Sequence, residues 1–354
     1  MSDSYILTVK DHKEWSNLLE KCKQADIHFT PEYMKLYQKR LNLINSSEAM
    51  LFVTKFSEKD FVLYPFFKRK INDKPIFSHM KEVLYDIVSP WYFGGILISS
   101  DENLNEKLKN FWDDFTNFAK KNYIITEFTR LHPLLPGNDI FGEICGAKYQ
   151  YDISYIDLKQ SFENIWKDFK KSNRNSVNSS QRKGVVIELS NSENALRKFF
   201  ELYTNTMKRL HAENPYFFSY EFLKEVQDEF KNNMLIVSAV LENKVIASSI
   251  FLHKYGIVHY WLSGFDTNYR SYFPNNLLIT EAIKWAKEQG EKTFCLMGGS
   301  NKNLQIFKES FSSTKTKFFT LSKVYDQEKY DHLNKIRNRV EKIDRLDFFP
   351  LYRT

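Results

Sequence analysis

Residues 234–265 read MLIVSAVLENKVIASSIFLHKYGIVHYWLSGF, and this stretch decides the fold of the second half of the chain. It contains runs rich in β-branched and aromatic residues, separated by short polar turns: Met234–Leu241, Val245–Leu252 and Ile257–Phe265. Such spacing predicts strands joined by hairpins, which together form a β-meander. Because side chains alternate along a strand, His259 and Trp261 would share one face while Tyr260 takes the other.

A helix and a further strand are expected after the meander. Asp266–Pro274 forms a polar and aromatic loop, and a helix begins near Asn275. Its apolar residues recur at helical spacing: Leu278, Ala282, Trp285 and Ala286. Gly290 would end this helix. The strand Thr293–Met297 follows and ends at Gly298-Gly299-Ser300. This order of elements predicts an α/β unit.

The first half of the chain shows the same order of elements. A strand-rich segment at 51–67 precedes an amphipathic helix at 103–121 and a strand at 124–131. We therefore expect an α/β (α+β) protein with two similar domains that face each other across a cleft, at 1–155 and 156–325. Residues 326–354 should pack back on the first domain, because a tail with so many large apolar side chains near its end buries them.

Composition excludes several classes of protein. Of the 354 residues 42% are hydrophobic and 16% aromatic, which excludes disorder. No apolar run approaches the roughly 18 residues that span a bilayer, and the N-terminus lacks the pattern of a signal peptide. The three cysteines are widely separated, which indicates a reducing compartment without disulfides: Cys22, Cys145 and Cys295. The sequence predicts a cytoplasmic protein without a transmembrane segment.

Basic residues suggest an anionic partner. The net charge is +7, and the segment 161–184 carries basic side chains at i, i+3, i+4 and i+7 of an expected helix: Lys167, Lys170, Lys171 and Arg174. This stripe would hold phosphates or an RNA backbone. The alternative is an ordinary solvated helix face.

Three further residues are candidates for chemistry. Lys308 follows Gly298-Gly299 on a short helix whose Leu304, Phe307 and Phe311 would face the core. It would neutralise charge on a bound ester or phosphate, although the residues alone favour a surface lysine. Tyr260 would donate a hydrogen bond to an acyl oxygen or an amine, or else pack in the core. Arg209 ends a helix that begins at Glu193 and would cap its carbonyls or bind a phosphate.

Several kinds of active site lack their sequence signature. No HxH or HxxxH spacing indicates a metal site, and GxSxG, Walker A and GxGxxG motifs are missing. We expect no metal and no bound cofactor. Cys295 lies in an apolar strand and should be inert. No residue stands out as a general base, for which Asp266 and Glu281 are the candidates.

Several motifs together resemble the Fem family of non-ribosomal peptidyltransferases, which belongs to the GNAT superfamily of acyltransferases. In chain order they are Thr30-Pro31-Glu32-Tyr33, Ser89-Pro90 with Gly94-Gly95, Glu127-Phe128-Thr129-Arg130-Leu131-His132-Pro133, Ile165-Trp166 through Arg174 to Gly184, Thr206-x-x-Arg209, Pro274-Asn275-Asn276-Leu277-Leu278, Gly298-Gly299 and Phe307-Lys308. The resemblance covers most of the chain and implies two GNAT-like domains.

The resemblance also implies a reaction. Fem enzymes transfer an aminoacyl group from aminoacyl-tRNA to an amine of a peptidoglycan precursor, so the implied partners are a nucleotide-linked cell-envelope precursor and tRNA. Arg209 would contact the diphosphate of the acceptor nucleotide. Lys308, with Phe307, would handle the donor ester, and Tyr260 would line the cleft. The family's phosphate-binding lysine has no clear match, since Tyr37 stands in its place, with Lys35 and Lys39 nearby, and Tyr33 replaces the tryptophan before it. Further candidates for substrate binding are Lys170 and Arg174.

Two alternatives remain open. Similar proteins in polysaccharide biosynthesis would use acyl-CoA or acyl carrier protein to acylate a nucleotide-linked amino sugar. The loop Arg270–Asn275 lacks the glycines that let backbone N–H groups approach a pyrophosphate, which disfavours ordinary acetyl-CoA use. The second alternative is a non-catalytic RNA- or envelope-binding module that uses the basic stripe. The oligomeric state is not predicted.

Overall fold

The chain folds into two compact units in a computed structural model that describes residues 3–299, 301–340 and 348–354. Unit 1 comprises Met1–Tyr151 and Lys317–Thr354, and unit 2 comprises Asp152–Thr316. The strand β7 (Lys148–Asp157) carries the chain from unit 1 into unit 2, and β13 (Lys315–Val324) returns it. The divisions between the units fall four residues before the predicted boundary at 155/156 and nine residues before that at 325/326.

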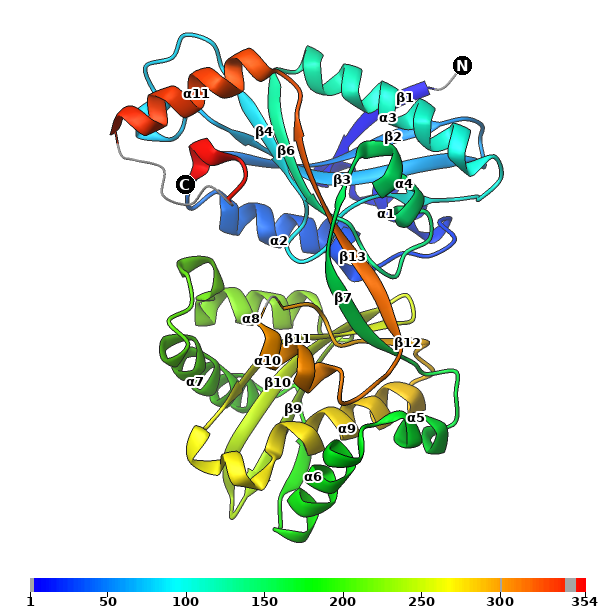
Figure 1. Cartoon of the computed structure of the whole chain (residues 1–354), viewed down its shortest axis with the longest axis vertical. Helices are drawn as coiled ribbons and strands as arrows, with labels where there is room; N and C mark the ends of the chain where they lie inside the picture. The colour runs from blue at the N-terminus through cyan, green and yellow to red at the C-terminus, as the bar shows by residue number, and fades with distance from the viewer. Residues whose placement is uncertain (1–2, 300, 341–347) are drawn as a thin grey trace. The chain divides into compact units, whose positions relative to one another are not determined.

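Unit 1 is built on a mixed sheet (Figure 1). Its strands, in spatial order, are β1 (Asp3–Thr8), β2 (Ser47–Lys55), β3 (Phe61–Lys70), β4 (Tyr85–Val88), β6 (Ile124–Arg130) and β13. Neighbouring strands are antiparallel except β4 and β6, which are parallel. The short β5 (Leu97–Ile98) pairs with β3. The hairpin expected within 51–67 is present as β2 and β3.

Helices pack on this sheet through aromatic side chains. They are α1 (His12–Glu20), α2 (Pro31–Leu41), α3 (Leu104–Lys121), α4 (Asn138–Cys145) and α11 (Gln327–Val340). The predicted amphipathic helix is α3, and it buries Phe111 and Phe115 against Phe52 of β2 and Tyr64 of β3. Thr30 caps α2 by accepting a hydrogen bond from the Tyr33 N–H. In the described part of the chain, no helix is long and apolar enough to cross a membrane.

The last described residues form part of unit 1. Tyr352, in the 3-10 turn η6 (Leu351–Arg353), is buried and its hydroxyl lies 2.6 Å from Thr126 Oγ1. The buried Asp86 carboxylate accepts from Arg69 Nε at 2.8 Å and from Arg353 Nε at 2.7 Å. The pKa of Asp86 is lowered because these two guanidinium groups outweigh the effect of burial, which opposes ionisation. This buried ion pair fixes the C-terminal segment to the sheet.

Unit 2 has a second sheet with the predicted meander at its centre. Its strands, in spatial order, are β8 (Val186–Leu189), β9 (Met234–Leu241), β10 (Lys244–Lys254), β11 (Ile257–Phe265), β12 (Thr293–Cys295) and β7. Strands β8 to β11 are antiparallel, β11 and β12 are parallel, and β12 and β7 are antiparallel. The three strands and two turns read from the sequence are confirmed.

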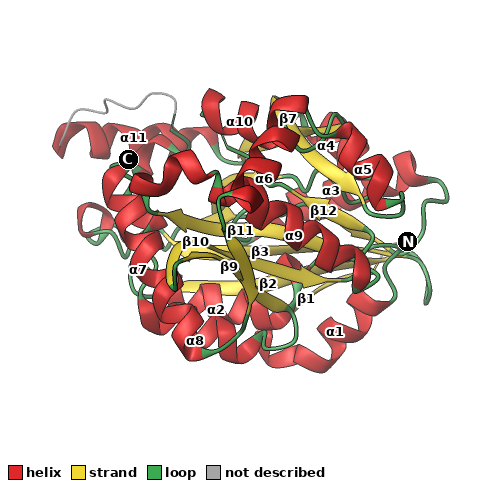
Figure 2. Cartoon of the chain, turned by 90° about the horizontal axis from the view of Figure 1, so that it is seen from below, coloured by secondary structure: helices red, strands yellow, loops and turns green. Residues whose placement is uncertain are grey.

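Helices cover both faces of this sheet (Figure 2). They are α5 (Phe162–Asp168), α6 (Lys171–Arg182), α7 (Glu193–Arg209), α8 (Tyr220–Glu229), α9 (Pro274–Glu288) and α10 (Lys302–Lys308). Tyr260 belongs to the core on the side of α6 and α9, whereas Trp261 contacts Phe218, just before α8, on the other side. Gly264 faces α7, where a Cβ would lie 2.7 Å from the Leu202 carbonyl oxygen. Glycine at this position allows the helix to lie against the strand.

The prediction of one continuous helix over 161–184 is wrong. It is divided into α5 and α6 by extended backbone at Phe169 and Lys170. The Lys170 N–H donates to the Ser310 carbonyl at 2.9 Å, and the Asp168 carboxylate accepts from the Ser313 N–H at 2.8 Å. These bonds to a distant segment replace the bonds that a continuous helix would make, so the four basic residues do not form one stripe.

Candidate active site

The candidate site lies in unit 2, where two parallel strands separate. β11 and β12 pair from Ile257 with Thr293 to His259 with Cys295, and β11 then continues to Phe265 without β12. A bulge opposite the step from Ile250 to Phe251 of β10 falls beside Tyr260. Bulges increase the local twist of a strand and redirect its side chains. Beyond His259 the described part of β12 no longer pairs with β11, so the two strands open apart at this point.

Lys308 lies at this opening. It is the last residue of α10 and only 7% exposed, so the surface lysine favoured by the residues alone is wrong. Its Nζ donates to the carbonyl oxygens of Met297 at 3.0 Å and Gly298 at 2.9 Å, just beyond β12. The Nζ also lies 5.8 Å from the ring centroid of Tyr260. An ammonium group has three donors, so one N–H remains beyond these two bonds.

Burial changes the acidity of both side chains. It lowers the pKa of Lys308 to about 8, because the charged ammonium loses its hydration. Burial also raises the pKa of Tyr260, a shift that hydrogen bonds with Ser263 and Ser249 oppose. At neutral pH the lysine is therefore a cation and the tyrosine is a neutral phenol. Both can donate a hydrogen bond to an oxygen on which negative charge develops.

The turn that carries the accepting carbonyls is shaped by its own side chains. Met297 has a positive φ of 59°, which is uncommon for a residue other than glycine. At Gly299 a Cβ would come within 2.8 Å of Leu304 Cδ2, and Gln305 Nε2 donates to the Gly299 carbonyl at 2.9 Å. The described residues of this turn, 297–299, thus position Lys308. Leu304, expected in the core, is 40% exposed.

The other predicted site residues of unit 2 do not all gather at Lys308. Phe307 is half-buried and packs edge-on against Phe311. Arg209 is exposed at the end of α7, with its guanidinium 5.2 Å from the Phe265 ring at the end of β11. Arg174 donates to main-chain carbonyls at the end of α5, those of Lys167 at 2.9 Å and of Phe169. Lys170 is exposed and precedes α6.

Basic and aromatic side chains surround the loop that follows β11. Lys183 Nζ donates to the Ser271 carbonyl at 2.6 Å and lies 5.5 Å from the Tyr272 ring. Lys244 Nζ lies 3.1 Å from Asp266 Oδ2 and 4.6 Å from the Tyr269 ring. These lysines would supply positive charge to an anionic ligand at the 3-10 helix η5 (Thr267–Tyr272).

Neither of the carboxylates considered as general bases is well suited to that role. Slight burial raises the pKa of Asp266, but hydrogen bonds from the Asn268 N–H and Lys244 outweigh it, so the pKa is lowered overall. Glu281 forms an ion pair with Lys284 at 2.8 Å within α9. The donors around Asp266 make that carboxylate a weak proton acceptor, and Glu281 already has Lys284 as its partner.

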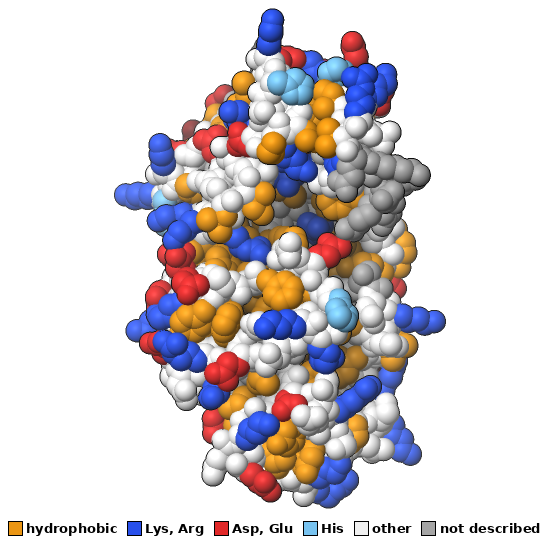
Figure 3. All heavy atoms as spheres, turned by 90° about the vertical axis from the view of Figure 1, so that its left-hand side faces the viewer, with side chains coloured by type: hydrophobic (Ala, Val, Ile, Leu, Met, Phe, Trp, Pro, Cys, Tyr) orange, Lys and Arg blue, Asp and Glu red, His pale blue; other side chains and the backbone are white. Residues whose placement is uncertain are grey.

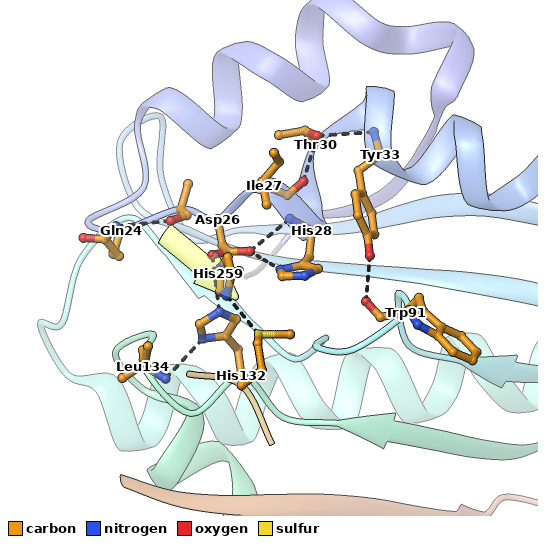
Figure 4. Close-up of polar contacts among 12 residues, drawn as sticks. Gln24, Asp26, Ile27, His28, Thr30, Tyr33, Trp91, His132, Leu134 and His259 are labelled. Carbon is orange, nitrogen blue, oxygen red and sulfur yellow. Dashed lines mark hydrogen bonds and ion pairs between the residues drawn. The ribbon is translucent and has the colours of Figure 1, made fainter. Parts of the chain in front are cut away.

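Unit 1 contains a cluster that the sequence did not reveal. Asp26, His28 and His132 are fully buried, and one potential ligand atom from each lies within 4.8 Å of the others (Figure 4). Asp26 and His28 are near neighbours, but His132 follows β6, far along the chain. An Asp-x-His pair gives only a faint signal in the sequence, because no second histidine stands near it at metal-ligand spacing. Lys35, the other predicted residue of unit 1, is exposed on α2.

Known proteins resemble this chain in sequence over part of unit 2 and in fold over most of its length. Residues 167–308 match the acetyltransferase (GNAT) domain family, and the match ends at Lys308. A search of curated proteins found no match to the sequence. Among solved structures, FemX is 12% identical, with a TM-score of 0.67 over 93% of this chain and 99% of FemX.

Two other solved structures share the fold. A tandem GNAT protein from the clavulanic acid biosynthesis pathway is 8% identical, with a TM-score of 0.52 over 92% of this chain and 99% of that one. The C-terminal domain of a protein assigned as a lysylphosphatidylglycerol synthetase from Agrobacterium fabrum is 11% identical, with a TM-score of 0.51 over 91% and 93%. The GNAT match in unit 2 and the likeness to FemX confirm the expected resemblance: residues 167–308 are similar to the acetyltransferase (GNAT) domain family, and the chain shares its fold with FemX and with a tandem GNAT protein.

Proposed function

We propose that this protein forms an amide by transferring an aminoacyl or acyl group to an amine of a nucleotide-linked cell-envelope precursor in the cytoplasm. The observation that carries the proposal is Lys308, a buried ammonium at the point where β11 and β12 separate in the GNAT domain. A buried cation with an unused donor favours an oxygen that becomes negative during a reaction.

The residues around Lys308 suggest how transfer would proceed. The acceptor amine attacks the carbonyl carbon of the donor, and the carbonyl oxygen takes up negative charge as the C–N bond forms. Lys308 would donate its remaining N–H to that oxygen, while its other bonds to Met297 and Gly298 hold the ammonium in place. The C–O or C–S bond of the donor then breaks, and the leaving group takes a proton. Tyr260 lies beside Lys308 and would contact the acyl group.

Aminoacyl-tRNA is the donor that the surroundings of α9 favour. The loop from Asp266 to Phe273 contains no glycine. At the start of α9 Pro274 has no N–H, and the N–H groups of Asn276 and Leu277 bond to the Phe273 carbonyl at 3.1 and 3.5 Å. Few N–H groups are thus left for a coenzyme A pyrophosphate. The FemX fold supports the same choice.

An acyl-CoA or acyl carrier protein donor remains the second candidate. Lys183 and Lys244 beside η5 favour it, because they could bind the phosphates of a pantetheine arm in place of backbone N–H groups. The acceptor would then be a nucleotide-linked amino sugar. A non-catalytic RNA-binding module has less support. Arg174 is engaged by carbonyls, Lys167 pairs with Glu163 at 2.7 Å, and Figure 3 shows basic side chains scattered over the face it draws.

The proposal is tested by incubating the whole chain with charged tRNA, acetyl-CoA or acyl carrier protein, each with a UDP-linked muramyl peptide or a UDP-linked amino sugar. Mass spectrometry would detect the amide. Transfer from tRNA to the peptide, abolished in Lys308→Met, supports the first donor, and transfer only from a thioester supports the second. No amide with any pair, despite binding of the ligands in calorimetry, would refute acyl transfer to these acceptors.

A further inference from the structure

Serine side chains pair across the meander of unit 2, in which β10 lies between β9 and β11 (Figure 1). Ser238 of β9 is opposite Ser248 of β10, and their hydroxyl oxygens lie 2.9 Å apart. Ser249 of β10 is opposite Ser263 of β11, again with 2.9 Å between the oxygens. Successive side chains of a strand point to opposite faces, so Ser248 and Ser249 belong to different faces. The meander therefore carries a serine pair on each of its faces.

The pair formed by Ser249 and Ser263 lies on the face that α6 and α9 cover. Ser249 is opposite Val237 of β9, and Val237 and Tyr260 belong to the same core on that face. Ser249 is fully buried and Ser263 is half-buried. Both serines hydrogen-bond with the Tyr260 hydroxyl. We call these three groups, all of unit 2, the hydroxyl cluster.

The hydroxyl cluster adjoins Lys308. The Lys308 Nζ lies 5.8 Å from the ring centroid of Tyr260. Tyr260 is the first residue of β11 beyond its pairing with the described part of β12, and Ser263 follows three residues later on the same strand. A carbonyl group whose oxygen accepts from Lys308 would therefore bring the substituents on its neighbouring carbon close to the cluster.

The surroundings of the hydroxyl cluster are apolar. The Phe251 ring stacks on the Tyr260 ring with 5.5 Å between centroids, and the half-buried Phe265 packs against the same core. In such surroundings hydrogen bonds are strong, and a polar group without a partner is costly. Each hydroxyl offers one donor and two acceptor positions, so the bonds among three hydroxyls use only part of their capacity. A polar substituent of a substrate would use the remainder, whereas an alkyl group would bury it unpaired.

We propose that the hydroxyl cluster selects the acyl group that is transferred, and that this group carries an amino or hydroxyl substituent on the carbon next to its carbonyl. The inference rests on the proposed function and narrows its donor to aminoacyl or hydroxyacyl esters and thioesters. The carbonyl oxygen accepts from Lys308, and the substituent bonds with Ser263 and Tyr260. A site built to hydrogen-bond a substrate group discriminates strongly against the analogue that lacks this group.

The test compares donors that differ only in this substituent: alanyl, lactyl and propionyl groups, which carry an amino group, a hydroxyl group and a hydrogen. Each is placed on the carrier, tRNA or coenzyme A, from which the whole chain transfers an acyl group. We expect kcat/KM for the alanyl and lactyl groups to exceed that for the propionyl group by about 10²-fold, the effect of leaving buried polar groups unpaired. A propionyl group transferred as well as the other two would overturn the proposal.

Serine variants show whether the cluster causes this preference. Ser263→Ala should reduce it to about tenfold or less by slowing alanyl and lactyl transfer. Ser263→Thr keeps the hydroxyl on a residue that suits a strand, and it should retain the preference. Ser238→Ala is the matched control, because it removes a buried hydroxyl from the pair on the opposite face. An unaltered preference in Ser263→Ala, or an equal loss in Ser238→Ala, would overturn the proposal.

Failure of the selection and failure of the proposed function give different results. Equal transfer of all three groups would leave acyl transfer standing and overturn only the selection, whereas no transfer of any group would refute the proposed function itself. A further measurement needs no substrate. Carbon NMR of labelled tyrosine, assigned with Tyr260→Phe, reports the ring carbon that bears the hydroxyl. Ser263→Ala should shift this signal and Ser238→Ala should not, and an unshifted signal in Ser263→Ala would show that the cluster does not exist.

Discussion

Replacing Lys308 by methionine tests the candidate active site most directly. The change keeps the length of the side chain and removes its charge and its donors. If Lys308 stabilises the developing oxyanion, the rate of acyl transfer should fall by about 10²- to 10³-fold, which corresponds to about 3–4 kcal/mol. Lys302→Met, at the exposed first residue of the same helix, is the matched control and should leave the rate unchanged.

The same substitution has a consequence for stability that needs no substrate. Burial lowers the Lys308 pKa from 10.5 to about 8, so holding the ammonium in the folded state costs about 3 kcal/mol below pH 8. Between pH 8 and 10.5 the unfolded chain binds more protons at this position than the folded chain, so stability from this group rises with pH. Below pH 8, Lys308→Met removes that cost but leaves the Met297 and Gly298 carbonyls without their donor, at about 1–3 kcal/mol each.

Denaturant unfolding at several pH values measures this difference. Relative to Lys308→Met, the wild-type protein should gain about 3 kcal/mol between pH 8 and 10.5. Its transfer activity should fall above pH 8 as the ammonium is lost. A stability difference that does not change with pH would show that Lys308 is not a buried cation. Full activity in Lys308→Met with an unaltered alkaline limb would refute its catalytic role.

Three further outcomes follow from other contacts. Asp86→Asn should lower the free energy of unfolding by about 3–5 kcal/mol in urea, because it leaves Arg69 and Arg353 without their buried anion, and an unchanged midpoint would contradict the described ion pair. Gly264→Ala should destabilise the chain by about 1–3 kcal/mol in thermal unfolding, since its Cβ meets the backbone of α7. At Gly290 a Cβ meets no neighbouring atom, so Gly290→Ala should lower the stability only through the backbone strain of its positive φ. Arg209→Ala should raise KM for a nucleotide-linked acceptor with little change in stability, and an unaltered KM in steady-state kinetics would remove Arg209 from acceptor binding.

Local signals in the sequence were sufficient for most of the secondary structure. Alternating β-rich runs and short turns gave β9, β10 and β11, because hairpin partners are close in the chain and their registers depend on the turns between them. The start of α2 could also be predicted from the sequence, since Thr30 caps the helix and Pro31 is favoured as its first residue. The order of motifs along the chain also indicated the Fem-like fold that the comparison with FemX supports.

The prediction from the sequence was wrong where the secondary structure depends on residues far away in the chain. The helix expected over 161–184 breaks because Asp168 and Lys170 bond to residues 310–313, which no periodicity within the helix can reveal. Arg174 therefore binds carbonyls of its own chain instead of extending a basic stripe. A pattern of charges predicts a surface only if the helix that carries it is continuous.

The sequence by itself determined the strands, the helices and the class of fold, because hydrophobic period and capping residues act over a few neighbouring positions. Only the tertiary structure decided which polar groups are buried and what they contact. The sequence alone favours a surface position for Lys308, whereas in the folded chain its Nζ donates to the Met297 and Gly298 carbonyls. His132 joins Asp26 and His28 only when β6 and the turn before α2 come together. The pKa of Lys308 depends on desolvation, and only folding removes its ammonium from water.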